Sequence, residues 1–187
     1  METHHIKPRH WLLVCVCLWL AGLGLAVAED TASLAEYQVK ATFLYNFTKF
    51  TDWPASAFTA TNAPLIIGIV GDNPFGKTLE DLVRGETRRG HPLVVKYLRR
   101  DDDLRGCHEL FIVRCDAERM AGLLQKIKGS PMLTVSDVRG FAEQGGMINF
   151  VLVKEKVKME INPAVAEAAG LKISSQLLAL ARIVKSN

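Results

Sequence analysis

Apolar residues along the chain follow two patterns, short continuous runs and helical stripes, and the two alternate through its middle. Apolar runs of about four to eight residues bounded by turn-forming residues are typical of buried strands, and spacings of three and four residues are typical of helices. The runs predict strands at Leu65–Val70, Pro92–Leu98, Glu109–Val113, Met132–Val135, Met147–Val153 and Val157–Ile161. The stripes predict helices at Leu34–Phe50, Leu79–Val83, Asp116–Lys128, Val138–Gln144, Ala164–Ala169 and Leu177–Val184.

This alternation predicts an α/β fold with a mostly parallel central sheet and helices on both faces. Only Lys154–Lys156 joins the last two strands, which predicts a C-terminal antiparallel hairpin at the edge of the sheet. Ligands of such sheets bind where loops leave the carboxyl ends of the strands. We therefore expect a ligand cleft at the polar residues that follow two of the strands, namely Asp72, Asn73, Ser136 and Asp137. Capping of the next helix is the alternative role for the last two.

The first helix carries two apolar stripes on nearly opposite faces. One stripe consists of Leu34, Tyr37, Ala41, Leu44 and Tyr45, and the other of Val39, Phe43, Phe47 and Phe50. A surface helix needs only one apolar face, so we expect cover on both sides, from the same domain or from a second protein. If a second protein supplies it, the partner or dimer surface consists of Phe43, Phe47, Phe50 and Trp53. Full burial of the three phenylalanines within one chain would contradict that mapping.

Residues 1–28 have the pattern of a secretory signal peptide. Lys7 and Arg9 precede the apolar run Trp11–Leu25, and Ala26–Ala28 supplies small residues for cleavage. An uncleaved anchor is the alternative, because the run is near the lower limit of about 17 residues for a spanning helix. With cleavage, residues 29–187 form a single exported domain that is long enough to bury a core.

Charge and cysteine content limit the function further. The formal net charge is only +3, which does not favour nucleic-acid binding. Cys107 and Cys115 lie outside the leader, and export to an oxidising compartment favours disulfides. However, an intervening strand would separate their Cα atoms by roughly 26 Å, and a disulfide needs about 7 Å or less. We expect two thiols that do not pair with each other, with a bridge between two chains as the alternative.

Gly71–Thr78 matches the phosphate-binding loop pattern G-x-x-x-x-G-K-[ST] between a predicted strand and a predicted helix. Asp72 places negative charge where phosphates would lie, and Pro74 lacks a backbone N–H that should bind them. We therefore reject nucleotide hydrolysis. The histidines outside the leader, His91 and His108, have no further ligands at metal-site spacing beyond the adjacent Cys107, so we predict no metal, no cofactor and no catalytic activity.

Three blocks of sequence carry a resemblance to a known family. Residues 39–54 read VKATFLYNFTKFTDWP, residues 67–76 read IGIVGDNPFG, and residues 133–152 read LTVSDVRGFAEQGGMINFVL, continued at residues 159–184 by MEINPAVAEAAGLKISSQLLALARIV. These blocks resemble the YfiR-like family of periplasmic proteins and span most of the chain beyond the leader. The resemblance implies an α/β fold, a periplasmic location, a tendency to form homodimers, and regulation rather than catalysis.

The resemblance also implies partners. The best-known members of the YfiR-like family bind the periplasmic sensor domain of an inner-membrane diguanylate cyclase and repress the enzyme, which lowers cyclic-di-GMP and biofilm formation. An OmpA-like outer-membrane lipoprotein relieves that repression. The type member depends on two intramolecular disulfides, which Cys107 and Cys115 alone do not provide, so redox control is not expected here. The alternative function is a periplasmic small-ligand sensor that uses the polar residues at the carboxyl ends of the strands.

Overall fold

The computed structural model describes residues 33–99, 101–115 and 117–186. The predicted leader and the predicted helix cap Asp116 lie outside these ranges. The chain divides into two units, residues 1–36 and 37–187, and the described part of the first, residues 33–36, is helical. Across the three described ranges, no helix combines the length and the hydropathy that a membrane span requires. The following description concerns the second unit.

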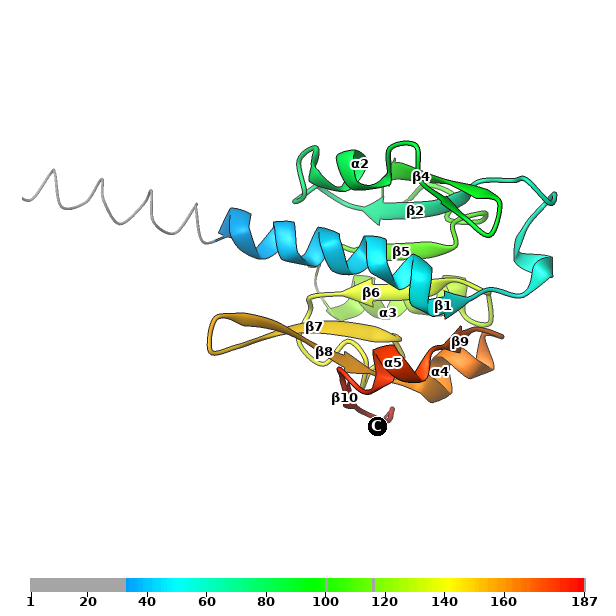
Figure 1. Cartoon of the computed structure of the whole chain (residues 1–187). Coiled ribbons are helices and arrows are strands. Elements are labelled where there is room, and N and C mark those ends of the chain that lie inside the picture. The colour runs from blue at the N-terminus through cyan, green and yellow to red at the C-terminus, as the bar shows by residue number, and fades with distance from the viewer. Residues whose placement is uncertain (1–32, 100, 116, 187) are drawn as a thin grey trace, which may run out of the picture. The chain divides into compact units, whose positions relative to one another are not determined.

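The centre of this unit is an eight-stranded sheet, counted over the described residues (Figure 1). Its strands are β2 (Leu65–Val70), β3 (Thr87–Arg88), β4 (His91–Leu98), β5 (Glu109–Ile112), β6 (Leu133–Ser136), β7 (Ile148–Val153), β8 (Lys156–Ile161) and β10 (Arg182–Ile183). Their order is β10-β8-β7-β6-β5-β2-β4-β3. The strands from β4 to β7 in this order are parallel, and β7 and β8 form an antiparallel hairpin. The predicted fold class is therefore confirmed.

The remaining elements lie around this sheet. The short strands β1 (Thr51–Asp52) and β9 (Lys172–Ile173) pair antiparallel in a second, two-stranded sheet. The helices are an N-terminal helix at residues 33–50, η1 (Ala55–Ala57), α2 (Thr78–Val83), α3 (Ala117–Ile127), α4 (Pro163–Ala168) and α5 (Ser175–Leu178). Asn162 and Ser174 cap α4 and α5, because their side-chain oxygens accept hydrogen bonds from the backbone N–H groups of Val165 and Leu177.

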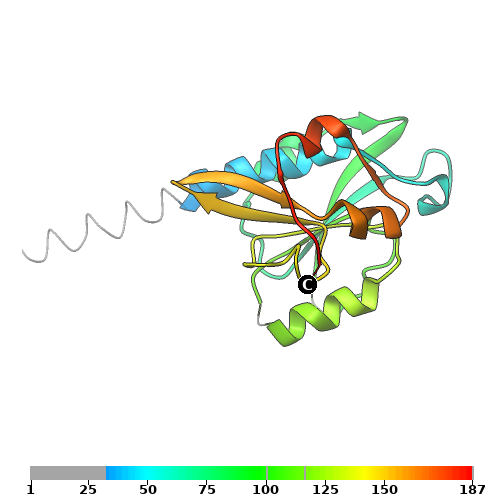
Figure 2. The same ribbon diagram turned by 90° about the horizontal axis from the view of Figure 1, so that it is seen from below.

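Helices cover both faces of the sheet, and each face has its own apolar core. The N-terminal helix lies on one face, where Leu44 and Phe47 pack among buried residues of β2, β5, β6 and β7. On the opposite face, α3 buries Met120, Leu123 and Ile127 against the other side of β2 and β5 (Figure 2). Alternate residues of the central strands therefore enter different cores, which explains why these strands are apolar along their whole length.

The N-terminal helix buries one continuous face rather than two. The buried residues are Lys40, Ala41, Leu44, Phe47 and Thr48. Tyr37, Phe43, Tyr45 and Phe50 are half-buried on either side of this face, and Val39 is 45% exposed. The apolar pattern did not include Lys40 and Thr48 in this buried face, because both are polar. Their side chains are buried because they form hydrogen bonds with Asp137 and with the carbonyl of Tyr45.

Two predicted helices differ from the structure. Residues 138–145 form successive turns instead of a helix, because Gly140 adopts a φ of 75° that a right-handed helix does not allow. The last helix ends at Leu178, and Arg182 and Ile183 then pair with β8 as the edge strand β10. The pattern also missed β3, which forms a tight hairpin with β4 through Arg89 and Gly90.

Candidate functional site

Ser136 lies at the carboxyl end of β6, where the sequence predicts a ligand cleft, but its bonds are to the protein. The residue is completely buried. Its Oγ donates a hydrogen bond to the carbonyl oxygen of Ile112 (2.7 Å) and accepts one from the backbone N–H of Val138 (3.2 Å). The hydroxyl therefore joins the ends of two neighbouring strands and fixes the start of the following turn.

Asp137 forms a buried ion pair with Lys40 of the N-terminal helix. The Lys40 Nζ lies 2.6 Å from Asp137 Oδ2, and the two side chains are 3% and 5% exposed. The Tyr37 hydroxyl donates to the same oxygen over 3.0 Å. Charges withdrawn from water need such close partners, so this pair fixes the helix to the carboxyl end of β6.

Asp72 and Asn73, the other two predicted cleft residues, are exposed on the loop after β2. The Asn73 side chain accepts a hydrogen bond from the N–H of Phe75 and donates one to the carbonyl of Gly76, both over 2.9 Å. This arrangement is an Asx turn, which stabilises the loop itself. A ligand cleft at these four residues stays a prediction, and three of them have bonding roles within the fold.

The predicted partner surface divides between core and surface. Phe47 is completely buried and stacks on Phe150 of β7 with ring centroids 5.8 Å apart. It belongs to the core of its own chain, so its assignment to a partner surface is wrong. Phe43, Phe50 and Trp53 are half-buried. A partner surface at these three aromatic residues stays a prediction.

Cys107 is buried beside Gly68 and Leu110, and burial raises the pKa of its thiol. Cys115 is half-buried, and the extended strand β5 lies between the two cysteines. Their failure to pair with each other stays a prediction that this separation favours. Among the residues that the structure describes, no group of three or more histidine, cysteine, aspartate or glutamate side chains could hold a metal ion.

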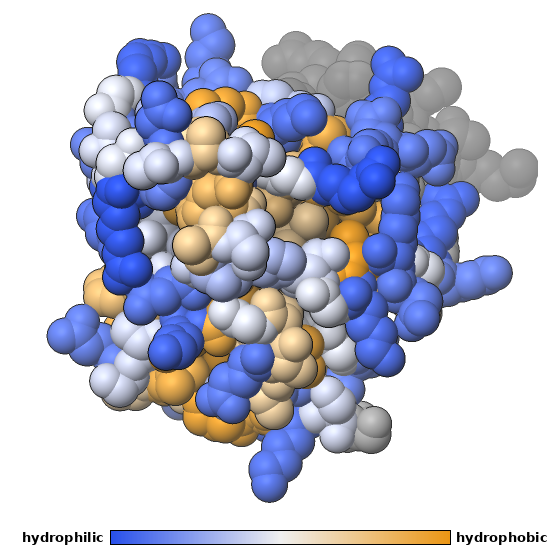
Figure 3. Space-filling model, turned by 90° about the vertical axis from the view of Figure 1, so that its right-hand side faces the viewer, coloured by the Kyte–Doolittle hydropathy of each residue, from blue (hydrophilic) through white to orange (hydrophobic). Residues whose placement is uncertain are grey.

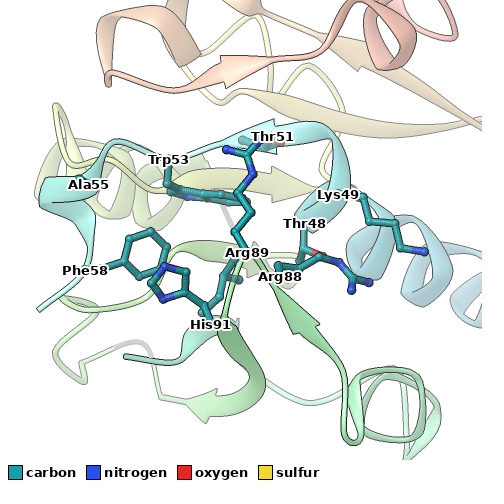
Figure 4. A pocket seen from close by; sticks show the side chains of 10 residues that line it. Thr48, Lys49, Thr51, Trp53, Ala55, Phe58, Arg88, Arg89 and His91 are labelled. Carbon is teal, nitrogen blue, oxygen red and sulfur yellow. The ribbon is translucent and has the colours of Figure 1, made fainter. Parts of the chain in front are cut away.

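A pocket of about 410 Å³ lies at the opposite end of the parallel strands, their amino ends. We call it the amino-end pocket. It is lined by Thr48, Lys49, Thr51, Trp53, Ala55, Phe58, Leu65, Arg88, Arg89 and His91. Figure 4 shows Trp53, Phe58 and His91 on one side, Thr48, Lys49 and Arg88 on the other, and Arg89 between them. The pocket therefore has an aromatic side and a cationic side.

The aromatic side is built on a stack of three rings. The Phe58 ring lies between His91 and His108, with centroid distances of 3.8 and 4.4 Å. His108 Nδ1 accepts a hydrogen bond from the N–H of Ile66, and its Nε2 donates to the carbonyl of Ala57. Burial lowers the pKa of His108, which favours this neutral form. The Trp53 indole donates to the carbonyl of His108 over 2.8 Å.

The cationic side contains two arginines with different surroundings. Arg88 donates to Thr48 Oγ1 and to the Glu86 carboxylate, both over 3.2 Å, and its guanidinium lies 4.8 Å from the Tyr45 ring centroid. Hydrogen bonds from Tyr45 and Arg88 lower the pKa of Glu86. Arg89 instead forms an ion pair with Asp52 at the surface. Arg88 is therefore fixed within the wall, and Arg89 is accessible.

Glu109 is a buried acid at the first residue of β5. It is 0% exposed, and within the described chain neither carboxylate oxygen has a hydrogen-bond partner. Its burial raises the pKa well above 4.5, so the carboxyl group is neutral over a wider pH range than usual. No feature of the sequence distinguishes it from the surface glutamates.

Sequence patterns missed the partners of Asp137 and most of the amino-end pocket. Lys40 and Asp137 are 97 positions apart, so spacing alone could not connect them. The pocket residues come from the end of the N-terminal helix, the segment from β1 to the residue after η1, the first residue of β2 and the β3–β4 hairpin. The available signal was the run Arg88-Arg89-Gly90-His91, in which two arginines precede a glycine of a tight turn.

Comparison with known proteins places the chain in a family. A family model described as YfiR/HmsC-like matches residues 37–182, which include the helix that covers the sheet and every strand from β1 to β9. No curated protein matches the chain. Because the model covers most of the chain and agrees with the resemblance in the three sequence blocks, this protein belongs to the YfiR/HmsC-like family.

Proposed function

We propose that the protein is a periplasmic regulator that binds the periplasmic sensor domain of an inner-membrane diguanylate cyclase and represses its activity. The observation that carries the proposal is the family match over residues 37–182, since this family suggests regulation of such a cyclase. Binding to one conformation of the sensor domain would hold the enzyme in its inactive population. The result is lower cyclic-di-GMP in the cytoplasm and less biofilm.

Regulation without catalysis agrees with the chemistry of the predicted cleft. Ser136 and Asp137 are bonded to backbone and to Lys40, which leaves them structural roles. In the loop that matches the phosphate-binding pattern, Asn73 fixes an Asx turn and Asp72 is exposed. These polar groups stabilise the fold, which supports binding rather than catalysis as the function.

We place the partner surface on the exposed side of the N-terminal helix and the segment after it. Phe43 and Phe50 are half-buried there, and Val39, one helical turn before Phe43, is 45% exposed. Trp53, which follows β1, extends this surface beyond the end of the helix. Figure 3 shows the side of the molecule that lies on the right in Figure 1, where apolar patches lie among polar side chains. Partly exposed aromatic residues are frequent centres of protein interfaces. As the alternative, we propose that a second copy of this chain binds the same surface and forms a homodimer.

The test measures cyclic-di-GMP in a host that lacks the protein and then regains it, with its own leader, from a plasmid. We expect the chain to lower cyclic-di-GMP and to copurify with a diguanylate cyclase from solubilised membranes. An unchanged cyclic-di-GMP level, or copurification of unrelated sensors only, would contradict the proposal. An OmpA-like lipoprotein supplied in excess should restore the cyclic-di-GMP level, and periplasmic fractionation checks the location.

A matched pair of variants tests the surface separately. Val39→Glu changes the proposed surface, and Val94→Glu makes the same change on β4, where Val94 is 42% exposed. A buried charge destroys apolar contacts, so we expect Val39→Glu to weaken repression at least tenfold and Val94→Glu to leave it unchanged. Both variants should keep the melting temperature. Equal repression by the two variants would show that the partner surface is not at Val39, and it would not contradict the proposed repression itself.

A further inference from the structure

We propose that the amino-end pocket binds a small organic anion, with its oxyanion group against Arg88, Arg89 and Thr51 and its apolar body against Trp53 and Phe58. The proposal does not rest on the proposed partner regulation, although Trp53 belongs both to the pocket and to the proposed partner surface. The pocket volume of about 410 Å³ falls within the usual range of roughly 300–1,000 Å³ for small-molecule sites. An aromatic side and a cationic side facing one cavity fit a ligand with an apolar part and a negatively charged part (Figure 4).

Two buried polar atoms of the lining indicate which group the pocket accepts. Within the described chain, the Oγ1 of Thr51 and the Nη2 of Arg88 have no hydrogen-bond partner. Thr51 is only 3% exposed. Buried polar groups in native proteins are almost always paired, so an unpaired hydroxyl and an unpaired guanidinium nitrogen on two residues that line one pocket favour a ligand that accepts hydrogen bonds. Both atoms can donate to a carboxylate or a phosphate oxygen.

Arg89 has a backbone conformation that its residue type disfavours. It is the first residue of the two-residue β3–β4 turn, with a φ of 51°, and Gly90 follows with a φ of 88°. Turns of this kind prefer asparagine or glycine at the first position. Here the turn instead places a guanidinium across the pocket (Figure 4).

The charge balance favours an anion over a cation. Lys49, Arg88 and Arg89 line the pocket, and the carboxylates that bond to the arginines are Glu86 and Asp52. The Arg89–Asp52 pair is largely solvated, with side chains 73% and 47% exposed. Exposed ion pairs are weak, so a ligand oxyanion can replace Asp52 as the partner of Arg89. The remaining positive balance suits a carboxylate or a phosphate monoester.

Calorimetric titration of the purified chain tests the site with four probes: benzoate, phenyl phosphate, inorganic phosphate and benzylamine. We expect benzoate or phenyl phosphate to bind at least tenfold more tightly than inorganic phosphate, to raise the melting temperature, and to weaken as salt increases. Comparison of the first two probes identifies the carboxylate or the phosphate as the preferred group. Binding of benzylamine alone, equal binding of all anions, or no binding below 10 mM would overturn the proposal.

Two substitutions with the same backbone effect provide the control. Arg89→Asn removes the accessible guanidinium from the pocket and gives the turn a preferred residue. The protein should therefore remain folded, and its affinity for the anion should fall at least tenfold. Lys154→Asn makes the same kind of change at the first position of the β7–β8 turn, where Lys154 has a φ of 49° and does not line the pocket. Equal affinities of the two variants would overturn the assignment of Arg89.

Discussion

The two ends of the parallel strands use their polar residues in opposite ways. At the carboxyl end, Asp137 is buried with Lys40 and Tyr37, and at the amino end Arg89 and Lys49 are exposed around a pocket. The N-terminal helix causes the difference, because from Tyr37 onwards it runs antiparallel to the strands, and its Tyr37 and Lys40 bind Asp137 at the carboxyl end of β6 (Figure 1). The usual rule for ligand sites assumes that this end is open. Here the helix closes this end at β6, whereas Asp72 remains exposed after β2, and the accessible cations of the pocket lie at the other end.

The same contrast separates two buried acids, Asp137 and Glu109. Asp137 receives a lysine and a tyrosine hydroxyl at 2.6 and 3.0 Å. Glu109 has no hydrogen-bond partner within the described chain, and its burial raises its pKa. Thus the buried carboxylate at the carboxyl end has close partners, and burial at the amino end favours the neutral form of Glu109. Substitutions at both ends test this comparison, and they follow from the largest expected effect to the smallest.

Lys40→Met should have the largest effect. The substitution retains an apolar stem and removes the ammonium group, which leaves the Asp137 carboxylate buried without its cation. Breaking a buried ion pair on one side costs about 3–5 kcal/mol, and we expect that decrease in the free energy of unfolding. Urea denaturation measures it, with Lys49→Met on the exposed side of the same helix as the control.

The double variant Lys40→Met/Asp137→Leu decides whether the pair acts as a unit. Removal of both charges should recover most of the stability that Lys40→Met loses, because no unpaired charge then remains. If the stability loss of the double variant instead equals the sum of the losses of Lys40→Met alone and Asp137→Leu alone, the two residues contribute separately. The carboxyl end would then not be closed by the ion pair, and the comparison of the two ends would fail.

Glu109→Gln should have an intermediate effect that depends on pH. The pKa of Glu109 is higher in the folded protein than in the unfolded chain. At pH values between these two pKa values, the folded protein keeps a proton on Glu109 that the unfolded chain has released. The contribution of this group to stability is complete below about pH 4.5 and decreases as pH rises towards the folded-state pKa, by up to about 1.4 kcal/mol per pH unit. Glutamine, which cannot ionise, should remove that decrease.

Denaturation of both proteins between pH 4 and 8 measures the difference. His108 acts in the opposite direction, because its lowered folded-state pKa makes stability rise with pH, but it does so equally in both proteins. The difference between them therefore isolates Glu109. A constant difference across this range would show that Glu109 is ionised when folded, and hence that it has a cationic partner.

Local patterns were sufficient for most of the framework. The apolar run Leu65–Val70 gives the bounds of β2, because a strand buried on both faces has no polar positions to confuse its limits. Asn162 and Pro163 mark the start of α4 for a reason equally local, since the cap and the first helical residue act on adjacent backbone groups. Such signals require no knowledge of distant residues.

The candidate sites depend on tertiary contacts, which local patterns do not contain. The sequence does not connect Lys40 with Asp137, and it does not show whether Phe47 is covered by its own domain, where Phe150 stacks on it, or by a second protein. The amino-end pocket required the β3–β4 hairpin, and strands of two residues are too short to show any periodicity. The sequence therefore predicted the positions of polar residues, but not which end of the sheet would remain open.

The smallest expected effect compares the two tight turns. Arg89→Asn and Lys154→Asn each place a preferred residue at a positive φ, which should raise the free energy of unfolding by about 0.5–1 kcal/mol. Arg89→Asn also removes the exposed pair with Asp52, worth about 0–1 kcal/mol, so its gain should be the smaller of the two. Urea denaturation in low salt measures both. A loss of more than 1 kcal/mol for Arg89→Asn alone would mean that Arg89 stabilises the amino end as Lys40 stabilises the carboxyl end, and the two ends would then differ in exposure but not in role.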